Sequence, residues 1–588
     1  MIVPMKKITL LVEQKESVDA VSALRQLGVM HLEHIRQPKG SDINLLQEDL
    51  ALAGRALEIL SEKDFIIPEL IEKKQKYDDW KTACRHIIDL RKRYSQLEDY
   101  SQALLGQIKF WQGWGDFEPE KIQALAGKNI FVRLYQIPIK EIDNLPKNAV
   151  VKNISVENGI ANCAIFSLDK VTLGYKEVAL PKTSLKGITR RRLEDQALMD
   201  DIRKELSRLS GLIPDLKQVH LGLEENLEFS RAVMGMGSAG QISYLSGYVP
   251  FNQEKLIRDL ARQRKWAAVF SLPSQEDNTP VLLKNPKWVS LINPVFKLME
   301  VVPGYRELDV SPVFLLFLAL FFGMIISDAG YGSVYFLLTF LAQRKLGAKV
   351  KDHTVFKLFY LFSFCAILWG ALSGVIFGQE WFLAKGFKPL LPVLNDSKFL
   401  MSFCFFLGAL QLSLGHGWQA IVKLPSLSAL ADIGFICLLW AGFLLARMFI
   451  VSAAFPDFGK WLIWSGILLI LFFSNPQRNI LKGIGSGAGT LALNLMGNFG
   501  DVVSYIRLFA VGLAGIAVSD SVNALAASAG GNLIAQILIV FIGHTINIVL
   551  GPISVLVHGV RLNVLEFSLL HGNVTWSGLA YKPLKKQG

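Results

Sequence analysis

Two arginines interrupt long apolar stretches near the C-terminus of this chain. Arg507 lies in SYIRLFAVGLAG and Arg561 lies in HGVRLNVLEF, and residues 521–560 contain no Asp, Glu, Lys or Arg. An arginine at bilayer depth costs at least ~2.5 kcal/mol on insertion scales, and it does not shed its proton to avoid that cost. A cation held there needs an anionic partner or a hydrated cavity. The two arginines therefore predict a membrane protein that translocates ions.

Polar residues continue at helical spacing along the same segments. One face of the last apolar segment, at spacings of 3, 4, 3, 4 and 3, consists of His544, Asn547, Gly551, Ser554, His558 and Arg561. The preceding segment adds Asn494, Asn498, Asp501, Ser504 and Arg507 on a slowly drifting face. Such a face predicts contact with a partner protein or a hydrated path rather than with lipid. Glu566 is rotated by about 140° from Arg561 at 100° per residue.

Acidic and polar residues are expected on both sides of the two arginines. At ~1.5 Å per residue, Asp501 lies ~9 Å and Glu566 ~7.5 Å to the cytoplasmic side of the nearer arginine. Asp520, Asn523, His544 and Asn547 are expected on the outer side. This order predicts two offset half-channels separated by an arginine belt, defined here as Arg507 and Arg561. The candidate half-channel residues are Asp501, Ser504, Glu566, His558, Asp520, His544, Asn547 and Ser554.

A fixed guanidinium favours the ionised form of a carboxylate that moves past it. The carboxylate would release its ion to one half-channel and take another ion from the second half-channel before it enters lipid. This chain has too few carboxylates near the belt to supply such a shuttle, so the mechanism predicts a second protein.

Structural roles for the same residues remain open. Arg507 could pair with Asp501 or Asp520, and Arg561 could pair with Glu566. His544 and His558 could serve helix packing instead of proton transfer. In SDAGYG, Asp328 is expected at a turn or helix end rather than at an ion site.

The second half of the chain has the composition of a membrane domain. Residues 306–588 hold only 19 of the 62 basic and 11 of the 50 acidic residues. Spans of ~30 Å need about 20 apolar residues. Ten basic residues in the expected inner loops and four in the outer loops place both termini in the cytoplasm. Eight transmembrane helices are predicted at 312–327, 328–345, 354–378, 398–421, 429–452, 459–475, 485–526 and 531–572, and the last two are long and either tilted or bent.

The first half reads as a soluble cytoplasmic arm of mixed α and β structure. Apolar residues at alternating spacings of four and three, from Leu46 to Leu60 and again from Leu206, predict an antiparallel coiled coil. Strand patterns lie between its two arms at 129–135, 149–156 and 161–168. The predicted domains are an arm, 1–305, and a membrane domain, 306–588. The arm divides into a proximal α/β lobe (1–41 with 236–290), the coiled coil (42–115 with 185–235) and a distal lobe (116–184).

Other functional classes lack support in the sequence. The glycine-rich GIGSGAGT lacks the Gly-Lys-Ser/Thr of a phosphate-binding loop. The nine histidines are scattered, and the five cysteines show no metal spacing and are read as free thiols. The basic residues of the arm are interspersed with acids, which argues against nucleic-acid binding. We expect no catalytic site, cofactor or metal on this chain.

The chain resembles the membrane stator subunit of V-type and A-type rotary ATPases, called subunit a in eukaryotes and subunit I in bacteria and archaea. SYIRLFAVGLAG and HGVRLNVLEF carry the resemblance most specifically, with GYVP, PVLLKN and the SDAGYG pair in support. The resemblance covers nearly the whole chain. Eukaryotic members tend to carry glutamate where this chain has Gly551, and histidine where it has Gly515 and Asp501.

The resemblance implies that Arg507 and Arg561 face the essential carboxylate of a rotating proteolipid ring. It also implies a lipid bilayer, peripheral stalk subunits of the E and G type and a rotor-side collar subunit as partners, and a prokaryotic cell membrane as location. A secondary transporter with a regulatory cytoplasmic domain is the main alternative, although no repeat relates 312–421 to 429–572. A membrane-tethered scaffold is the second alternative.

Overall fold

The computed structural model describes residues 1–70, 79–144, 149–157, 159–169, 173–307, 309–350, 352–378, 389–476 and 480–586. Four of the basic residues used above to predict the orientation lie outside these ranges, namely Lys351, Lys385, Lys388 and Arg478. The chain forms two compact units. One consists of Met1–Leu10, Val29–Leu32 and Ser246–Pro583, and the other of Leu11–Gly28, Glu33–Leu245 and Leu584–Gly588.

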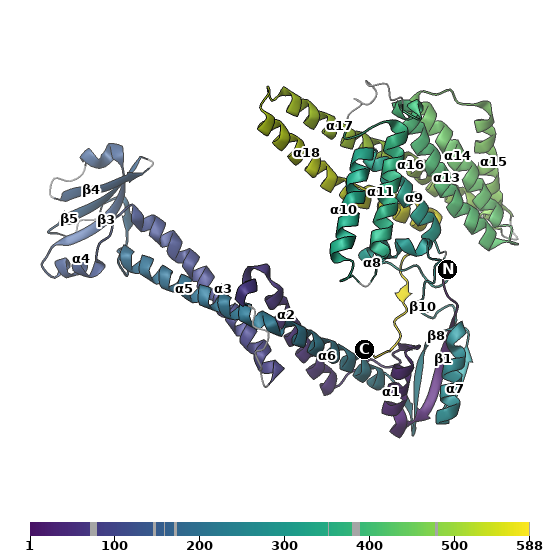
Figure 1. Ribbon diagram of the computed structural model, residues 1–588, viewed down its shortest axis with the longest axis horizontal. Helices are drawn as coiled ribbons and strands as arrows, with labels where there is room; N and C mark the ends of the chain where they lie inside the picture. Colours follow the sequence, from purple (N-terminus) through teal and green to yellow (C-terminus); the bar gives the residue numbers. More distant parts are fainter. Residues whose placement is uncertain are drawn as a thin grey trace. The chain divides into compact units, whose positions relative to one another are not determined.

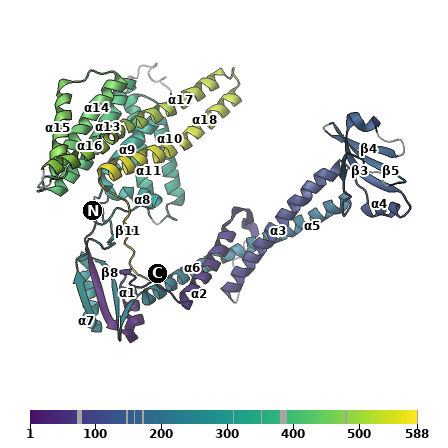
Figure 2. The same ribbon diagram turned by 180° about the vertical axis from the view of Figure 1, so that it is seen from behind.

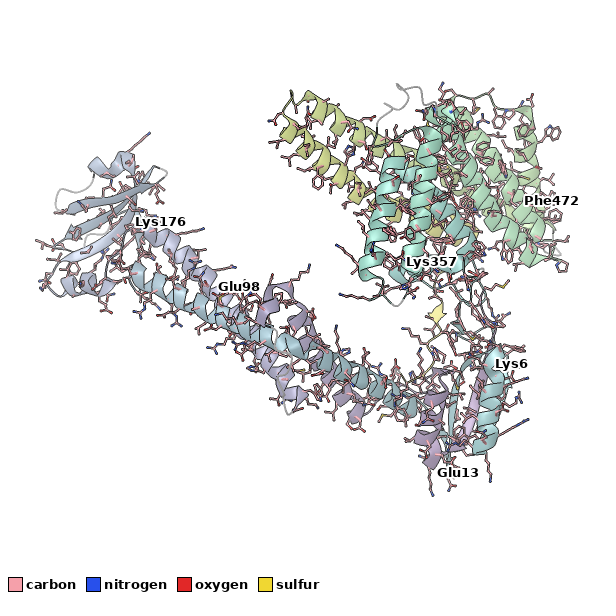
Figure 3. The ribbon with its side chains drawn as sticks, viewed as in Figure 1. Lys6, Glu13, Glu98, Lys176, Lys357 and Phe472 are labelled. Carbon is pink, nitrogen blue, oxygen red and sulfur yellow. The ribbon has the colours of Figure 1, made fainter. Side chains whose placement is uncertain are left out.

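The N-terminal part of the predicted proximal lobe folds as a strand, a helix and a strand. It forms β1 (Met5–Glu13), α1 (Ser17–Leu27) and β2 (His31–Glu33), and Gly28 ends α1 with a left-handed φ of 66° that favours glycine. The later segments form β8 (Ile242–Pro250), α7 (Glu254–Arg264) and β9 (Ala267–Ser271). The strands join in the order β2-β8-β1-β9, and Lys6 and Glu13 mark the two ends of β1 (Figure 3).

Four long helices pack in two pairs in the second unit. α3 (Trp80–Gln112) lies along α5 (Leu185–Leu209), and α2 (Ser41–Ser61) lies along α6 (Ile213–Met234) (Figures 1 and 2). Cys84, Ile87 and Leu206 are fully buried between them. Between α5 and α6 the helix is broken by a 3₁₀ turn at Ser210–Leu212, and Pro214 lies in the first turn of α6, where proline is tolerated. Coiled-coil geometry itself stays a prediction.

The region between α3 and α5 carries an antiparallel sheet. Its strands join in the order β4-β5-β3-β6, which are Val150–Glu157, Ile160–Ser167, Phe131–Pro138 and Lys176–Val178. α4 (Pro119–Ala126) precedes the sheet, and Lys176 marks the short strand β6 (Figure 3). Ile137, Ala161 and Cys163 are fully buried in its core.

The apolar half is helical at each predicted span. In order, the helices are α9 (Ser311–Ile326), α10 (Ala329–Leu346), α11 (Thr354–Ser373), α13 (Ser397–Lys423), α14 (Ala429–Val451), α15 (Asp457–Phe473), α16 (Ile480–Ser504), α17 (Ile506–Ser528) and α18 (Leu533–Ser554). Among the described residues, five stretches are long and apolar enough to cross a membrane, at Thr354–Ser373, Ser397–Lys423, Ala429–Val451, Ile484–Ser528 and Leu533–His571. The count of eight spans stays a prediction.

Both of the longest apolar segments change their helical geometry near an arginine. The first is interrupted at Tyr505, two residues before Arg507. The second contains Pro552 and continues as two π-helical segments, Val555–Gly559 and Leu562–His571. Pro552 has no N–H for the carbonyl of Ile548, and the Tyr335 hydroxyl donates to that carbonyl instead at 2.7 Å. α17 and α18 lie side by side (Figures 1 and 2).

The C-terminal tail returns to the N-terminal part of the first unit. β11 (Leu579–Ala580) pairs in parallel with β10 (Pro280–Val281), and the Tyr581 hydroxyl donates to the Val29 carbonyl. Burial there raises the pKa of Tyr581 to about 12. Sequence patterns gave no indication of this pairing, because two-residue strands have no measurable periodicity.

Candidate functional site

The two arginines of the belt meet at a single carboxylate. Glu566 Oε1 lies 3.4 Å from Arg507 Nη1 and 3.7 Å from Arg561 Nε. Arg507 comes from the first turn of α17, and Arg561 lies between the two π-helical segments. Glu566 was a candidate lining residue of the half-channels, and its place in the structure is between the two arginines.

The π-helix explains why this contact was not expected. A rotation of about 140° separates Arg561 from Glu566 only in an α-helix. In a π-helix the hydrogen bonds run from residue i to residue i+5, so residues five apart lie closer to one face than they do in an α-helix. Leu562–His571 has this geometry. The expected rotation of Glu566 is therefore wrong, and the internal pairing left open for Arg561 is present.

The shared carboxylate does not balance the charge of the belt. Two guanidinium groups and one carboxylate leave one net positive charge. Neither Arg507 Nη1 nor Glu566 Oε2 has a hydrogen-bond partner in the described part of the chain. The Glu566 side chain is 5% exposed, whereas Arg507 is 26% and Arg561 is 54% exposed. The two guanidinium groups are therefore accessible to a partner protein, whereas the Glu566 carboxylate is buried.

A buried network that sequence reasoning missed holds the belt from behind. The Tyr505 hydroxyl donates to Gln411 Oε1 at 2.8 Å, and Gln411 Nε2 donates to Asn563 Oδ1 at 2.8 Å. Asn563 Nδ2 in turn donates to the carbonyl of Gly559 at 3.0 Å. Tyr505, Gln411 and Asn563 are all fully buried. Since Tyr505 is two residues from Arg507 and Asn563 is two residues from Arg561, α13 fixes both arginines through one amide.

A second polar cluster joins α10, α17 and α18. The Tyr331 hydroxyl contacts Ser519 Oγ at 2.7 Å and His544 Nδ1 at 2.6 Å, and Asn547 Nδ2 donates to Ser519 Oγ at 2.8 Å. His544 Nε2 also contacts Asn523 Oδ1 at 3.0 Å. The structure thus brings together three of the predicted outer residues, Asn523, His544 and Asn547. Tyr331 and Ser519 were missed, because they belong to α10 and α17 and only the fold brings them to the polar face of α18.

A cavity of about 150 Å³ lies beside this cluster. Residues of α9, α10, α17 and α18 line it, and Tyr331, Tyr335, Asn547 and Ser554 give it polar atoms. Gly515 and Gly551 also line it, and their lack of side chains leaves the space open. Since a water molecule occupies about 30 Å³ of liquid, the cavity has room for a few waters with polar partners.

A third polar group forms a chain across α16, α13, α14 and the end of the last π-helix. Asp501 Oδ2 lies 3.0 Å from His571 Nε2, and His571 Nδ1 lies 3.0 Å from His416 Nε2. His416 Nδ1 lies 3.4 Å from Asp432 Oδ1, and Lys423 Nζ donates to Asp432 Oδ2 at 2.7 Å. Of these five residues only Asp501 was a candidate. The other four were not recognised, because they are far from Asp501 in the sequence and only the fold brings them together.

The remaining candidates are Ser504, Asp520 and His558. Ser504 donates to the carbonyl of Gly500 in its own helix at 2.9 Å. Asp520 is exposed on α17, and His558 is half-buried in the first π-helical segment. Asp328 caps α10 through the Tyr331 N–H at 3.0 Å and accepts two more N–H groups from Phe377 and Gly378. These contacts favour the structural role expected for Asp328.

The described residues contain no group of three or more His, Cys, Asp or Glu side chains placed to hold a metal ion. All five cysteines are free. These two observations give no evidence for a metal site or a disulfide in the described part of the chain.

No family model matches the chain. Among curated proteins, it is 30% identical over 623 residues to V-type ATP synthase subunit I of Borreliella burgdorferi, across the full length of both chains. It is 29% identical over 638 residues to V-type ATP synthase subunit I 1 of Treponema pallidum, again across both full lengths. A-type ATP synthase subunit I of Methanocaldococcus jannaschii is 25% identical over 427 residues, which are 64% of this chain and 60% of the relative.

Among solved structures, the cytoplasmic N-terminal domain of subunit I, homolog of subunit a, of V-ATPase matches 45% of this chain and all of that chain. The sequence identity is 16% and the TM-score is 0.22, which is too low to support a shared arrangement.

Proposed function

Because the chain belongs to the V-type and A-type ATP synthase subunit I family, we propose that it is the ion-translocating stator of a rotary ATPase. In this role it holds the arginine belt against a ring of small proteolipid subunits, each with one buried carboxylate. The ions reach the ring through two half-channels. ATP chemistry takes place on other subunits, and no cofactor is required on this chain.

The observation that carries this proposal is the uncompensated charge at Glu566. One carboxylate between two arginines leaves a single positive charge, and Arg561 is the more exposed cation. If the charges of the belt were fully balanced within this chain, the belt would not attract a passing carboxylate. A belt with one surplus cation attracts one additional anion, which is what a ring subunit supplies.

The chemistry follows from electrostatics. A ring carboxylate that arrives at the belt is stabilised in its ionised form, because a nearby opposite charge favours that form. It releases its ion to one half-channel. The same carboxylate cannot enter lipid with its charge, so it takes an ion from the other half-channel before it moves on. The surplus cation also repels free cations and thereby opposes a leak between the half-channels.

The polar clusters support the two half-channels. The cavity between α9, α10, α17 and α18, with Tyr331, His544 and Asn547 beside it, suits the outer path. The chain from Lys423 to Asp501 suits the inner path. Within the first half of the sequence, the arm would bind peripheral stalk subunits of the E and G type and approach a collar subunit of the rotor.

Purification of the whole complex in mild detergent tests the assembly. A small, very apolar protein with one acidic residue in a helix should accompany the chain. Contact with the belt is tested by a cysteine at Val557, which is 54% exposed near Arg561, and cross-linking should join it to the ring. A cysteine at Trp461 on α15, 77% exposed, is the matched control and should not cross-link.

The transporter alternative makes a different prediction. A secondary transporter moves its substrate without ATP synthase subunits. The chain reconstituted alone in vesicles with an ion gradient should therefore show no coupled uptake. Uptake by the isolated chain would contradict the stator assignment.

A further inference from the structure

Two histidines in direct contact form the centre of the inner polar chain. His416 on α13 and His571 at the end of the last π-helix are joined at 3.0 Å, with ring planes at 81°. Each contacts a carboxylate with its other nitrogen, Asp432 and Asp501 respectively. Asp432 is 5% exposed and next to Lys423 at the loop between α13 and α14, whereas Asp501 is 17% exposed on α16.

The two carboxylates and two imidazoles of this polar chain determine how many hydrogens its contacts need. Ionised carboxylates only accept hydrogen bonds, and a neutral imidazole has a single N–H to donate. Three contacts join the four groups, but two neutral imidazoles supply hydrogens for only two. The third contact needs one additional proton.

The charges lead to the same result. Lys423 carries one positive charge, and Asp432 and Asp501 carry two negative charges. A buried group with an unbalanced charge is costly. One additional proton on the chain brings the total to zero. The hydrogen count and the charge balance therefore agree on a single bound proton.

From this geometry, and resting on the proposed function, we infer that Asp432, His416, His571 and Asp501 form a proton wire from the Lys423 loop to the ring-facing surface. The ion that the motor carries is accordingly the proton. An imidazole accepts a proton on one nitrogen and gives one up from the other. The single bound proton starts on Asp432, while the hydrogens of His416 and His571 are on Nε2. It passes to His416 Nδ1, the Nε2 proton of His416 passes to His571 Nδ1, and the Nε2 proton of His571 passes to Asp501, which releases it. One proton leaves for each that enters, and the rings regain their first tautomer by turning over between passages.

A metal cation has no comparable path along this chain. Hard cations are bound by several oxygen ligands. Here the central link joins two ring nitrogens directly, and Phe435 stacks on His416 with ring centroids 5.0 Å apart. The His571 backbone also packs against Gly415, where an added Cβ would lie 2.9 Å from its carbonyl carbon. A sodium ion would have to displace these contacts.

Substitutions of Asp501 separate a proton path from a structural contact. Asp501→Asn keeps the size and still accepts a hydrogen bond from His571, but it does not carry a proton. Asp501→Glu disturbs the packing but remains titratable. In membrane vesicles with the whole complex, we expect ATP-driven proton uptake to fall at least tenfold in Asp501→Asn and to stay within about threefold in Asp501→Glu. If Asp501 made only a structural contact, Asp501→Glu would lower proton uptake more than Asp501→Asn.

The histidines are tested in the same vesicles. His571→Gln and His416→Gln should each lower ATP-driven proton uptake at least tenfold with the ring still bound. His353→Gln, an exposed histidine before α11, is the matched control and should leave uptake unchanged. For the unmodified complex, uptake should proceed in sodium-free medium without accumulation of ²²Na⁺.

Normal uptake in Asp501→Asn or His571→Gln would overturn the wire. Accumulation of ²²Na⁺ by the unmodified complex would overturn the choice of the proton even if a histidine variant failed to assemble. If Arg507→Ala abolishes uptake while these variants transport normally, the proposed function stands and this inference alone fails.

Discussion

The Arg507 guanidinium lies 3.4 Å from the Glu566 carboxylate, and Glu566 also lies 3.7 Å from Arg561. Glu566 therefore sets how much positive charge the belt presents. With it, the belt carries one net charge, and without it the belt carries two. Since a ring carboxylate must both stop at the belt and leave it, the size of this charge should govern the rate of transport.

We predict that Glu566→Gln slows ATP-driven ion uptake by about tenfold, or ~1.4 kcal/mol in the barrier. The doubled charge would hold the ionised ring carboxylate too strongly for it to take up the next ion. Glu566→Asp keeps the negative charge and should transport several times faster than Glu566→Gln. Uptake assays on vesicles with equal amounts of complex compare the two. Equal rates in both variants would show that the charge of Glu566 does not tune the belt.

The network behind the belt gives a prediction about stability. Gln411→Leu removes the acceptor of the Tyr505 hydroxyl and the donor to Asn563 Oδ1 in a fully buried site. An unsatisfied buried polar group costs about 1–3 kcal/mol. The variant should unfold at lower temperature and transport more slowly, because both arginines lose a common support. Gln343→Leu on α10 is the control, since its hydrogen bond to Tyr360 is exposed and should matter little. Matching melting temperatures for the two variants would contradict the buried role of Gln411.

The cavity beside Tyr331 gives a prediction about the outer path. Gly515 lines the cavity, and a Cβ there would meet its nearest neighbours at 4.0 Å, so a small side chain fits. Gly515→Ala should transport at nearly the normal rate. Gly515→Leu extends into the space that waters would occupy and should reduce uptake by tenfold or more, with the complex still assembled. Normal uptake by Gly515→Leu would exclude this cavity as the path.

The pH dependence of the proximal sheet follows from Asp277. Its carboxylate accepts from Lys7 Nζ and from the Ser274 N–H, both at 2.7 Å. The hydrogen bond from Lys7 is the largest cause that lowers the pKa of Asp277 below its ordinary value. A lowered folded-state pKa stabilises the fold above the unfolded value, about 3.9, and this stabilisation is lost as the pH falls through the folded value.

Hydrogen exchange measures this effect locally. Amide protection of β1 should be steady from pH 7 to 5, after correction for intrinsic rates, and should fall below about pH 4. Asp277→Asn should start less protected and lose less on acidification. Asp259→Asn, an exposed position on α7, is the control and should follow the unmodified chain. A similar acid response in Asp277→Asn would contradict the role of the Lys7 contact.

The sequence allowed prediction of the features that depend on composition and regular spacing. Runs of apolar residues predicted where the helices of the apolar half lie, although the single helix expected at 485–526 is divided into α16 and α17. The 129–135 and 161–168 patterns became β3 and β5. The arginines and the polar face of α18 were visible because charged and polar residues are rare there. His544 and Asn547 indeed share one cluster.

Features that depend on local departures from regular structure or on distant contacts were not predictable. The π-helix after Arg561 gives Glu566 a different orientation from the one expected in an α-helix, and no residue pattern indicates this π-helix. His416 and His571 are far apart in the chain, and each resembles an isolated helix-packing histidine until the fold joins them. Gln411 was hidden for the same reason.

The central claim is that the arginine belt faces a moving carboxylate, and Arg507→Ala in the intact complex tests it most directly. ATP-driven ion uptake into vesicles should be abolished, while the ring and the other subunits still co-purify in normal amounts. Arg447→Ala on α14 is the control for loss of an arginine from the apolar helices and should retain uptake. If Arg507→Ala pumps at the normal rate, the belt has no part in transport and the account is contradicted.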